Sequence, residues 1–298
     1  MAEPASASLS LATASSIAGI RVSELAPGYP LLHLHHGKLQ ATLSLYGGQL
    51  LDCQQHGRAL IWRNPSLHVV PGKALRAGVP ICWPWFGTLD SALPAHGFVR
   101  TRHWQLHSAQ HHDDALTVTL AIQDDDSSRK LWPHRFALQL QIRLSDVLSV
   151  QLLMHNTDDH AWPAAGALHS YFAVSDIGTT QIADLDGVGY VDQLTGEQPL
   201  QHGALTFDRE TDRIYRRGHG TVRIHDGSHC LQLQQHGNTD TVVWTPWLNK
   251  AARLGDLRGD DWRQFVCVET AIANDHAVIL APGMQYAIGF TLSARSER

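Results

Sequence analysis

The strongest constraint in this sequence is an alternation of apolar and polar residues with a period of two. It is clearest over residues 136–144, and it resumes over residues 148–154 after the turn Ser145-Asp146. Successive side chains of a strand point to opposite faces, so each run predicts a strand with one buried face, and this pair predicts a β-hairpin. Similar runs occupy residues 39–45, 116–122 and 286–292.

Helical periodicity is scarce by comparison. Residues 248–261 can hold one short helix, since Leu248, Ala251 and Ala252 would share a face. Many short strands at roughly ten-residue spacing favour a sandwich or barrel, and the absence of a clear repeat argues against a propeller. We therefore predict an all-β fold, a large antiparallel β-sandwich. No Pro- or Ser-rich linker follows residue 20, so a single domain is expected over residues 21–298.

The first twenty residues differ in composition from the rest of the chain. They are rich in Ala and Ser and contain no Lys or Arg before Arg21. A secretory signal has a basic start and a solid apolar block, and this segment has neither. We therefore expect a flexible tail over residues 1–20, with an organelle transit peptide as the alternative.

Charge and cysteine content limit the expected partners and compartment. The net charge of −5 gives no reason to expect nucleic acid or an anionic membrane as a partner. No apolar run approaches the ~18 residues of a membrane span. The four cysteines form no CxxC pair, which is typical of a reducing compartment. These features predict a cytoplasmic monomer that acts on a small molecule.

The chain contains twenty histidines, which is an unusual number. They are scattered and show no HExxH spacing, and pairs such as His35-His36 and His111-His112 lie in polar stretches beside turn residues. Such pairs can bind a metal, but no cysteine or acidic residue stands at a metal-binding spacing. We therefore interpret them as surface histidines and predict no metal site.

Two segments gather cations and aromatic rings. Residues 75–87 place Arg76 among three aromatics, two prolines and two glycines, and residues 93–100 place His96 and Arg100 after a proline. Two guanidinium groups can supply the charge-assisted hydrogen bonds that a phosphate dianion needs. The alternatives are a rigid corner packed under a sheet for the first segment and a surface ion pair for either arginine.

Two further segments place a titratable side chain in an apolar, strand-like run. His169 lies in residues 167–176, and a lone histidine there can equally be a satisfied core residue. Glu269 lies in residues 265–271 and would share a strand face with Cys267. A buried carboxylate is costly unless it is paired or used, so Glu269 is either an ion-pair partner or a functional group.

Taken in order, the four segments RAGVPICWPWFG, LPAHGFVR, ALHSYFAVSDI and FVCVET resemble the glucose-6-phosphate 1-epimerases, the hexose 6-phosphate branch of the aldose 1-epimerase superfamily. The resemblance extends over about residues 40–292 and includes TDRIY at 211–215 and VVWTPW at 242–247. It implies a galactose-mutarotase-like supersandwich, which agrees with the independent all-β prediction. It also implies interconversion of the α and β anomers of D-glucose 6-phosphate or a related hexose 6-phosphate, without a cofactor.

The resemblance implies roles for single residues. His169 and Glu269 match the family's catalytic pair, and Arg76 and Arg100 match the arginines that hold the substrate phosphate. Asp212 matches an aspartate that binds sugar hydroxyls.

Several other positions bear on how the sugar is recognised. His96 matches a motif histidine expected near the sugar. Trp247, like Trp83 and Trp85, is a candidate for stacking on the sugar, with core packing as the alternative. The chain departs from the family pattern at three positions, of which the first leaves sugar choice open: Ala95, Thr245 and Thr270 stand where glutamine, asparagine and proline are common.

Anomer exchange requires that the sugar ring opens and closes again on the other face of C1. We hypothesise that Glu269 takes the proton of the C1 hydroxyl and that His169 gives one to the ring oxygen, from different sides of the sugar. The alternatives are a free-aldose mutarotase, a glycoside hydrolase using Asp212 and Glu269, and a sugar-phosphate-binding protein without turnover. Paired arginines argue against the first, an idle histidine against the second, and a matched acid and base against the third.

Overall fold

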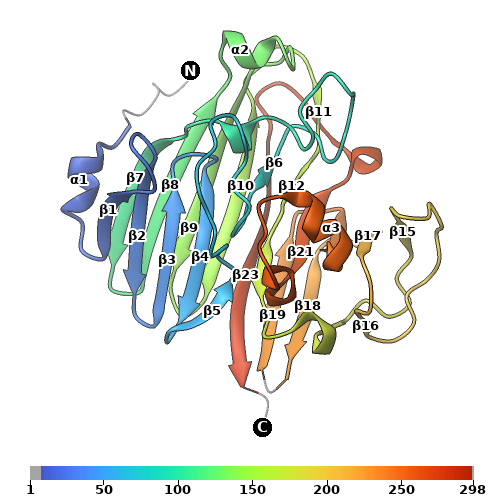
Figure 1. Cartoon of the computed structure of the whole chain (residues 1–298). Coiled ribbons are helices and arrows are strands. Elements are labelled where there is room, and N and C mark those ends of the chain that lie inside the picture. The colour runs from blue at the N-terminus through green and yellow to red at the C-terminus, as the bar shows by residue number, and fades with distance from the viewer. Residues whose placement is uncertain (1–7, 228, 297–298) are drawn as a thin grey trace.

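The structure is a computed structural model that describes residues 8–227 and 229–296. Within these residues the chain forms two large antiparallel sheets and one small one (Figure 1). The twelve-stranded sheet has the order β1 (Ile20–Glu24), β2 (Pro30–His36), β3 (Leu39–Ser44), β4 (Gln49–Gln55), β5 (Arg58–Ile61), β13 (Tyr171–Ala173), β21 (Phe265–Ile272), β20 (Asp240–Thr245), β17 (Thr211–Tyr215) and β15 (Tyr190–Asp192), and β12 (Gly166–Leu168) joins β21 to β6 (Ile81–Cys82).

The second sheet packs against the first. Its nine strands have the order β16 (Leu205–Thr206), β14 (Gln181–Ala183), β18 (Gly220–Asp226), β19 (His229–His236), β23 (Gln285–Ser296), β10 (Leu148–Asn156), β9 (Phe136–Leu144), β8 (Ala115–Gln123) and β7 (Gln105–His112). Figure 1 shows β2–β4 lying in front of β8–β10. A two-stranded ribbon pairs β11 (Trp162–Ala164) with β22 (Val278–Leu280).

The predicted strands are confirmed. In β9 and β10 every second residue is buried, and the two strands pair antiparallel with Ile142 opposite Val150. The runs at 39–45, 116–122 and 286–292 form β3, β8 and most of β23. The all-β prediction therefore holds, because alternating sequences can bury a full face only as strands of a sheet.

Helices are few and short. They are α1 (Leu11–Ser15), α2 (Asp126–Arg129), α3 (Trp247–Leu254) and the 3-10 turns Val99–Thr101, Ile177–Thr179, Asp261–Gln264 and Asn274–His276. The predicted helix at 248–261 corresponds to α3, which ends at Gly255 in the left-handed conformation. No helix in the described part of the chain is long and apolar enough to cross a membrane.

The main hydrophobic core lies between the two large sheets. Its buried side chains extend along the chain from Ala14 to Leu292 and come from both sheets, as Leu34, Val266 and Phe290 illustrate. Burial of apolar surface contributes roughly 25 cal/mol per Å² to folding. The core therefore fixes the position of the twelve-stranded sheet, whose outer face carries the site described below.

The expected flexible tail is wrong for residues 8–20. Helix α1 begins after Ser10, whose hydroxyl accepts a hydrogen bond from the N–H of Thr13 at 3.1 Å. Ala14 is fully buried in the main core, and the N–H of Leu9 donates to the carbonyl of Leu106 at 2.8 Å. These contacts hold the segment against β1 and β7, which an Ala- and Ser-rich composition does not reveal. Residues 1–7 lie outside the described residues.

Strand β21 is buried along its whole length. Val266 and Val268 face the main core. The opposite face, with Phe265 and Cys267, is covered by Trp62 from the segment after β5 and by Leu257 from the segment after α3. Residues 62–104, which connect β5 to β7, thus form a second layer over the sheet, and the candidate site lies between this layer and the sheet.

Candidate active site

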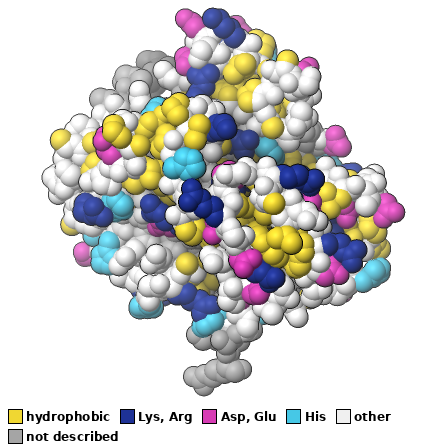
Figure 2. Space-filling model, in the orientation of Figure 1, with side chains coloured by type: hydrophobic (Ala, Val, Ile, Leu, Met, Phe, Trp, Pro, Cys, Tyr) yellow, Lys and Arg dark blue, Asp and Glu magenta, His cyan; other side chains and the backbone are white. Residues whose placement is uncertain are grey.

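A cavity of about 750 Å³ opens on the outer face of the twelve-stranded sheet. Six of the seven predicted site residues line it, although they are widely separated in the sequence: Arg76, His96, Arg100, His169, Asp212 and Glu269. Figure 2 views the face that carries helix α3, where Lys, Arg and His side chains gather near the centre. The structure therefore brings the cations and the titratable pair to one place.

Strand register places the acidic residues on the cavity face. Asp212 on β17 pairs with Trp244 on β20, which pairs with Cys267 on β21. Glu269 lies two residues beyond Cys267, and alternate residues of a strand share a face. The prediction that Glu269 and Cys267 share a face is therefore confirmed, and Asp212 joins them because paired residues of neighbouring strands point the same way.

His169 lies between β12 and β13, where the hydrogen-bond ladder that both strands form with β21 is interrupted. Leu168 pairs with Thr270 and Tyr171 with Cys267, so His169 stands opposite Glu269. The N–H of His169 donates instead to the carbonyl of Pro80, in the covering layer, at 2.9 Å. The imidazole is stacked on the ring of Tyr171 with a centroid separation of 5.1 Å, and its Nδ1 lies 3.4 Å from Oε1 of Glu269.

The surroundings favour the neutral forms of both groups. Burial, followed by the charge of Asp212, raises the pKa of Glu269 well above its usual value, while Arg100 opposes this shift. Burial lowers the pKa of His169 well below 6.5, and His96, Arg100 and Arg76 lower it further. Among the described residues, nothing forms a hydrogen bond with His169 Nδ1 or Glu269 Oε2.

Unsatisfied buried polar atoms are rare in proteins. The two unpaired atoms argue against His169 as a satisfied core histidine and against Glu269 as a simple ion-pair partner. Both residues line the cavity, where a bound ligand can provide the missing partners. The arrangement has the features of a proton-transfer site.

The two arginines differ in how they are held. Nε of Arg76 donates to both carboxylate oxygens of Asp256, at 2.7 and 2.8 Å, and Nη1 donates to the hydroxyl of Tyr171 at 3.1 Å. Nη2 of Arg100 donates to the carbonyl of Ala95 at 2.8 Å, and no carboxylate of the described residues forms an ion pair with it. Arg76 is thus fixed by an ion pair inside the cavity, whereas most of the hydrogen-bonding capacity of Arg100 remains for an anion.

The ring of His96 is oriented by the loop that carries it. Its Nδ1 accepts a hydrogen bond from the N–H of Gly87 at 3.2 Å, so the proton of the neutral ring resides on Nε2. Burial, Arg100 and Arg76 lower the pKa of His96 to about 3. His96 is therefore a neutral donor that lines the cavity.

Asp212 keeps a charge that can bind sugar hydroxyls near neutral pH. Burial raises its pKa to about 6, with Lys250 opposing the shift and Glu210 and Asp192 adding to it. Above that pH the carboxylate accepts hydrogen bonds, which is the role that the resemblance implies.

The tryptophans occupy other places than the sequence suggests. Trp247 is absent from the cavity lining; it begins α3 and packs on Trp262 with a centroid distance of 4.9 Å. Trp244 lines the cavity instead. Trp83 and Trp85 are buried in the main core, so core packing applies to both.

The three departures from the family pattern have different surroundings. Ala95 lines the cavity, where a small side chain leaves room beside Arg100. Thr245 is buried. The hydroxyl of Thr270 accepts a hydrogen bond at 3.1 Å from the amide of Gln235, which also donates to the carbonyl of Glu269 at 3.2 Å. Thr270 therefore belongs to the support beneath Glu269.

Gly97 allows the loop with His96 and Arg100 to approach the sheet. Its φ is +72°, and a Cβ added there would lie 1.8 Å from the carbonyl oxygen of Trp83. We expect Gly97→Ala to lower the free energy of unfolding by about 3 kcal/mol or more, because backbone atoms would have to move. Gly28→Ala is the matched control, since φ is +79° there and a Cβ meets nothing within 4 Å.

The control isolates the cost of the left-handed conformation, about 1 kcal/mol. Urea denaturation followed by circular dichroism measures both variants. Equal losses of stability in the two proteins would mean that the close approach at Gly97 is unimportant.

Comparison with known proteins places this arrangement in a family. The family model for aldose 1-epimerase matches residues 30–293. A curated protein of Salmonella typhimurium, named "Putative glucose-6-phosphate 1-epimerase", is 32% identical over 249 residues, which are 82% of this chain and 83% of that protein.

Two solved structures agree with the fold. A crystal structure described as that of "a putative mutarotase" from Salmonella typhimurium superposes with a TM-score of 0.84 at 29% identity, over 94% of this chain and 97% of that one. A galactose mutarotase-like protein from Clostridium acetobutylicum gives a TM-score of 0.72 at 14% identity, over 93% of this chain and 98% of that one, which bears on the fold alone. With its galactose-mutarotase-like fold and a family match over most of its length, the chain belongs to the aldose 1-epimerase family.

Proposed function

We propose that this protein interconverts the α and β anomers of D-glucose 6-phosphate or a related hexose 6-phosphate. The observation that carries the proposal is a single cavity that contains the His169–Glu269 pair together with the guanidinium groups of Arg76 and Arg100. Membership of the aldose 1-epimerase family supports a mutarotase, and the printed name of the Salmonella typhimurium relative agrees with the phosphorylated substrate.

The pair can perform both proton transfers. With Glu269 ionised and His169 protonated, a state that holds the same number of protons as the neutral pair, Glu269 takes the proton of the C1 hydroxyl while His169 protonates the ring oxygen, and the C1–O5 bond breaks. Rotation about C1–C2 presents the other face of the aldehyde, and reversed transfers close the ring. Both sugar oxygens are bonded to C1, so two neighbouring groups 3.4 Å apart suit the chemistry better than groups on different sides of the sugar. Protein side chains perform every proton transfer, so the proposal requires no cofactor.

A bound phosphate would favour the protonated form of His169 that ring opening needs, while it would work against ionisation of Glu269. In the free cavity Arg76 and Arg100 lower the pKa of His169, and Arg100 lowers that of Glu269. A dianion between the guanidinium groups offsets their charge, so both groups become easier to protonate when the substrate binds. The substrate phosphate would thereby prepare the acid that opens its own ring.

This linkage predicts a pH-dependent signal. In the free protein we expect the His169 ring to remain neutral at pH values where exposed histidines are protonated, because its pKa is lowered by burial, His96, Arg100 and Arg76. Saturating sulfate, a divalent anion that does not titrate in this range, should raise the His169 pKa. Long-range proton–nitrogen NMR of the imidazole rings measures the protonation state of His169 in the free protein and the change in its pKa with sulfate.

Arg100→Gln is the control for that experiment and should reduce the sulfate effect. Titration of His169 at or above pH 6.5 in the free protein would contradict the pKa argument. Sulfate that binds in the cavity without moving the His169 pKa would contradict the phosphate linkage.

The direct test of substrate class is a comparison of two sugars. Rates of anomer interconversion with glucose and with glucose 6-phosphate can be followed by polarimetry after dissolving one pure anomer. We expect kcat/KM to be at least about tenfold higher for glucose 6-phosphate, since charge-assisted hydrogen bonds contribute roughly 1.5–3 kcal/mol each. Equal values would favour a free-aldose mutarotase, and binding without turnover would favour a sugar-phosphate-binding protein. We also propose that the protein is a cytoplasmic monomer, and light scattering tests its oligomeric state.

A further inference from the structure

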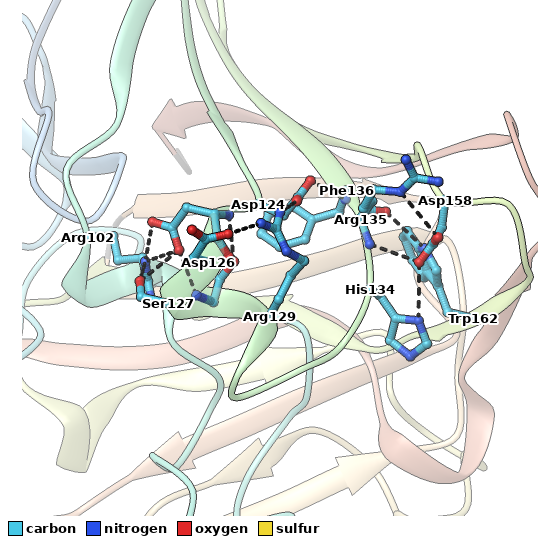
Figure 3. A network of polar contacts seen from close by, with 12 residues as sticks. Arg102, Asp124, Asp126, Ser127, Arg129, His134, Arg135, Phe136, Asp158 and Trp162 are labelled. Atoms are coloured by element: carbon cyan, nitrogen blue, oxygen red, sulfur yellow. Dashed lines mark hydrogen bonds and ion pairs between the residues drawn. The ribbon is translucent and has the colours of Figure 1, made fainter.

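A cluster of potential metal ligands lies away from the cavity, beside the connection between β10 and β11. His134, Asp158 and His160 each place one ligand atom within 4.8 Å of the others. Figure 3 shows His134 and Arg135 converging on Asp158. None of the three potential ligands lines the candidate active site. We propose that His134, Asp158 and His160 form a binding site for a divalent transition-metal cation of the zinc class.

The spacing of the ligand atoms fits a tetrahedral ion. Nδ1 of His134 lies 3.1 Å from Nε2 of His160 and 3.7 Å from Oδ2 of Asp158. Zinc binds nitrogen and oxygen ligands at about 2.0–2.2 Å, and a tetrahedron of that size has edges of roughly 3.4 Å. The two measured separations lie on either side of this value and the third lies within 4.8 Å, so adjustment of the side chains, with release of the proton shared by the two rings, would bring all three ligands around one ion.

The groups around the ligands orient them for a metal. Nδ1 of His160 lies 3.0 Å from Oδ1 of Asp159, so its proton is donated there and the lone pair of Nε2 points toward His134. Oδ2 of Asp158 accepts from the N–H of Arg135 at 3.0 Å, and Oδ1 accepts from the N–H of Asp159 at 2.9 Å. A histidine ligand that donates its other N–H to a carboxylate is a common feature of zinc sites.

The backbone that carries two of the ligands is itself fixed. The amide of the buried Asn156 donates to the carbonyl of His160 at 3.0 Å and to that of Leu280 at 2.7 Å, and its oxygen accepts from the N–H of Asp158 at 2.8 Å. The ring of His134 packs on Trp132 with a centroid distance of 4.4 Å. The ligands are thus held in place before any ion arrives, which lowers the entropic cost of binding.

Exposure and charge also suit a cation. The side chain of Asp158 is 6% exposed, that of His134 is 18% exposed and that of His160 is 54% exposed, so an ion can enter from solvent and keep a water in its fourth position. Arg135 approaches the carboxylates of Asp158 at 3.4 Å and of Asp159 at 3.8 Å. Two carboxylates against one guanidinium leave a net negative charge beside the two imidazole rings.

Isothermal titration of ZnCl₂ into the full-length protein, prepared without a polyhistidine tag, tests the proposal. We expect one site with a dissociation constant below about 10 μM, and tetrahedral Co²⁺ absorption bands when cobalt replaces zinc. His160→Ala should weaken zinc binding by more than about a hundredfold, because it removes a ligand. Asp159→Asn, which removes only the orienting carboxylate, should weaken it by about tenfold.

His111→Ala is the matched control. Nε2 of His111 lies 3.0 Å from Nδ1 of His36, which makes a second histidine pair, and no ion pair joins either ring to a carboxylate of the described residues. Zinc binding should be unchanged in this variant. The proposal is overturned if the wild type shows no zinc site below about 10 μM, or if His160→Ala, folded by circular dichroism, binds as tightly as the wild type. Equal losses in His160→Ala and His111→Ala would also overturn it.

Discussion

Replacement of Glu269 by glutamine is expected to reduce kcat for anomer exchange of glucose 6-phosphate by about 10²–10⁴-fold, with little change in KM. Glutamine keeps the size of the side chain but cannot accept the proton of the C1 hydroxyl. The fold should tolerate the change, because Glu269 is 2% exposed and its raised pKa favours the uncharged form that glutamine resembles. Polarimetry of a freshly dissolved anomer gives kcat and KM.

Asp52→Asn provides the control for that loss. Asp52 is also a largely buried carboxylate on the twelve-stranded sheet, but it pairs with Arg63 at 2.6 Å and lies outside the cavity. Activity per folded molecule should be unchanged in this variant. A Glu269→Gln protein that keeps kcat within about threefold of the wild type would exclude Glu269 from proton transfer.

Arg100→Gln is expected to change the choice of substrate rather than the chemistry. The loss of a charge-assisted contact with phosphate costs roughly 1.5–3 kcal/mol, so kcat/KM for glucose 6-phosphate should fall by about 10- to 100-fold. Glucose has no phosphate, and its kcat/KM should change by less than about threefold. Arg100 suits this test better than Arg76, because Arg76 also holds Asp256 and Tyr171.

Arg102→Gln is the control that shows whether the effect of Arg100→Gln depends on the position of the arginine or only on the loss of a positive charge. Arg102 lies two residues away and is paired with Asp125 at 2.9 Å, outside the cavity. We expect both sugars to react at wild-type rates in this variant. If Arg100→Gln slowed both sugars equally, Arg100 would serve the structure of the loop, and the phosphate assignment would fail.

The fold was predictable wherever one face of a strand is buried and the other is polar. The alternation of β9 and β10 is of this kind, and the hairpin follows from it. Strand β21 gives no such pattern, because residues 62–100 and the segment around α3 cover its outer face and all eight of its residues are buried. Helix α1 was missed for a related reason: Ala14 is buried by tertiary packing, and a short Ala- and Ser-rich segment carries no periodic signal of that contact.

The site was predictable in part. His169, Glu269 and the two arginines stand in segments that depart from simple alternation, and family resemblance joined them. Trp244 was within reach of the residue pattern, since it shares a strand face with Val242, whereas Trp247 begins a helix.

Other parts of the site left no local trace in the sequence. Asp256 lies 180 residues from Arg76 and belongs to none of the motifs, so nothing local indicates that the two form an ion pair. The unpaired atoms of His169 and Glu269 likewise emerge only when β21 and the β12–β13 connection meet.

Saturation-transfer NMR on the anomeric protons of glucose 6-phosphate tests the central claim most directly. With wild-type protein, saturation of the α signal should reduce the β signal at equilibrium, because each turnover carries magnetisation from one anomer to the other. The transfer should be absent with His169→Ala protein of wild-type stability. Transfer of equal size with both proteins, or none with either, would contradict the assignment of this cavity as a hexose 6-phosphate mutarotase site.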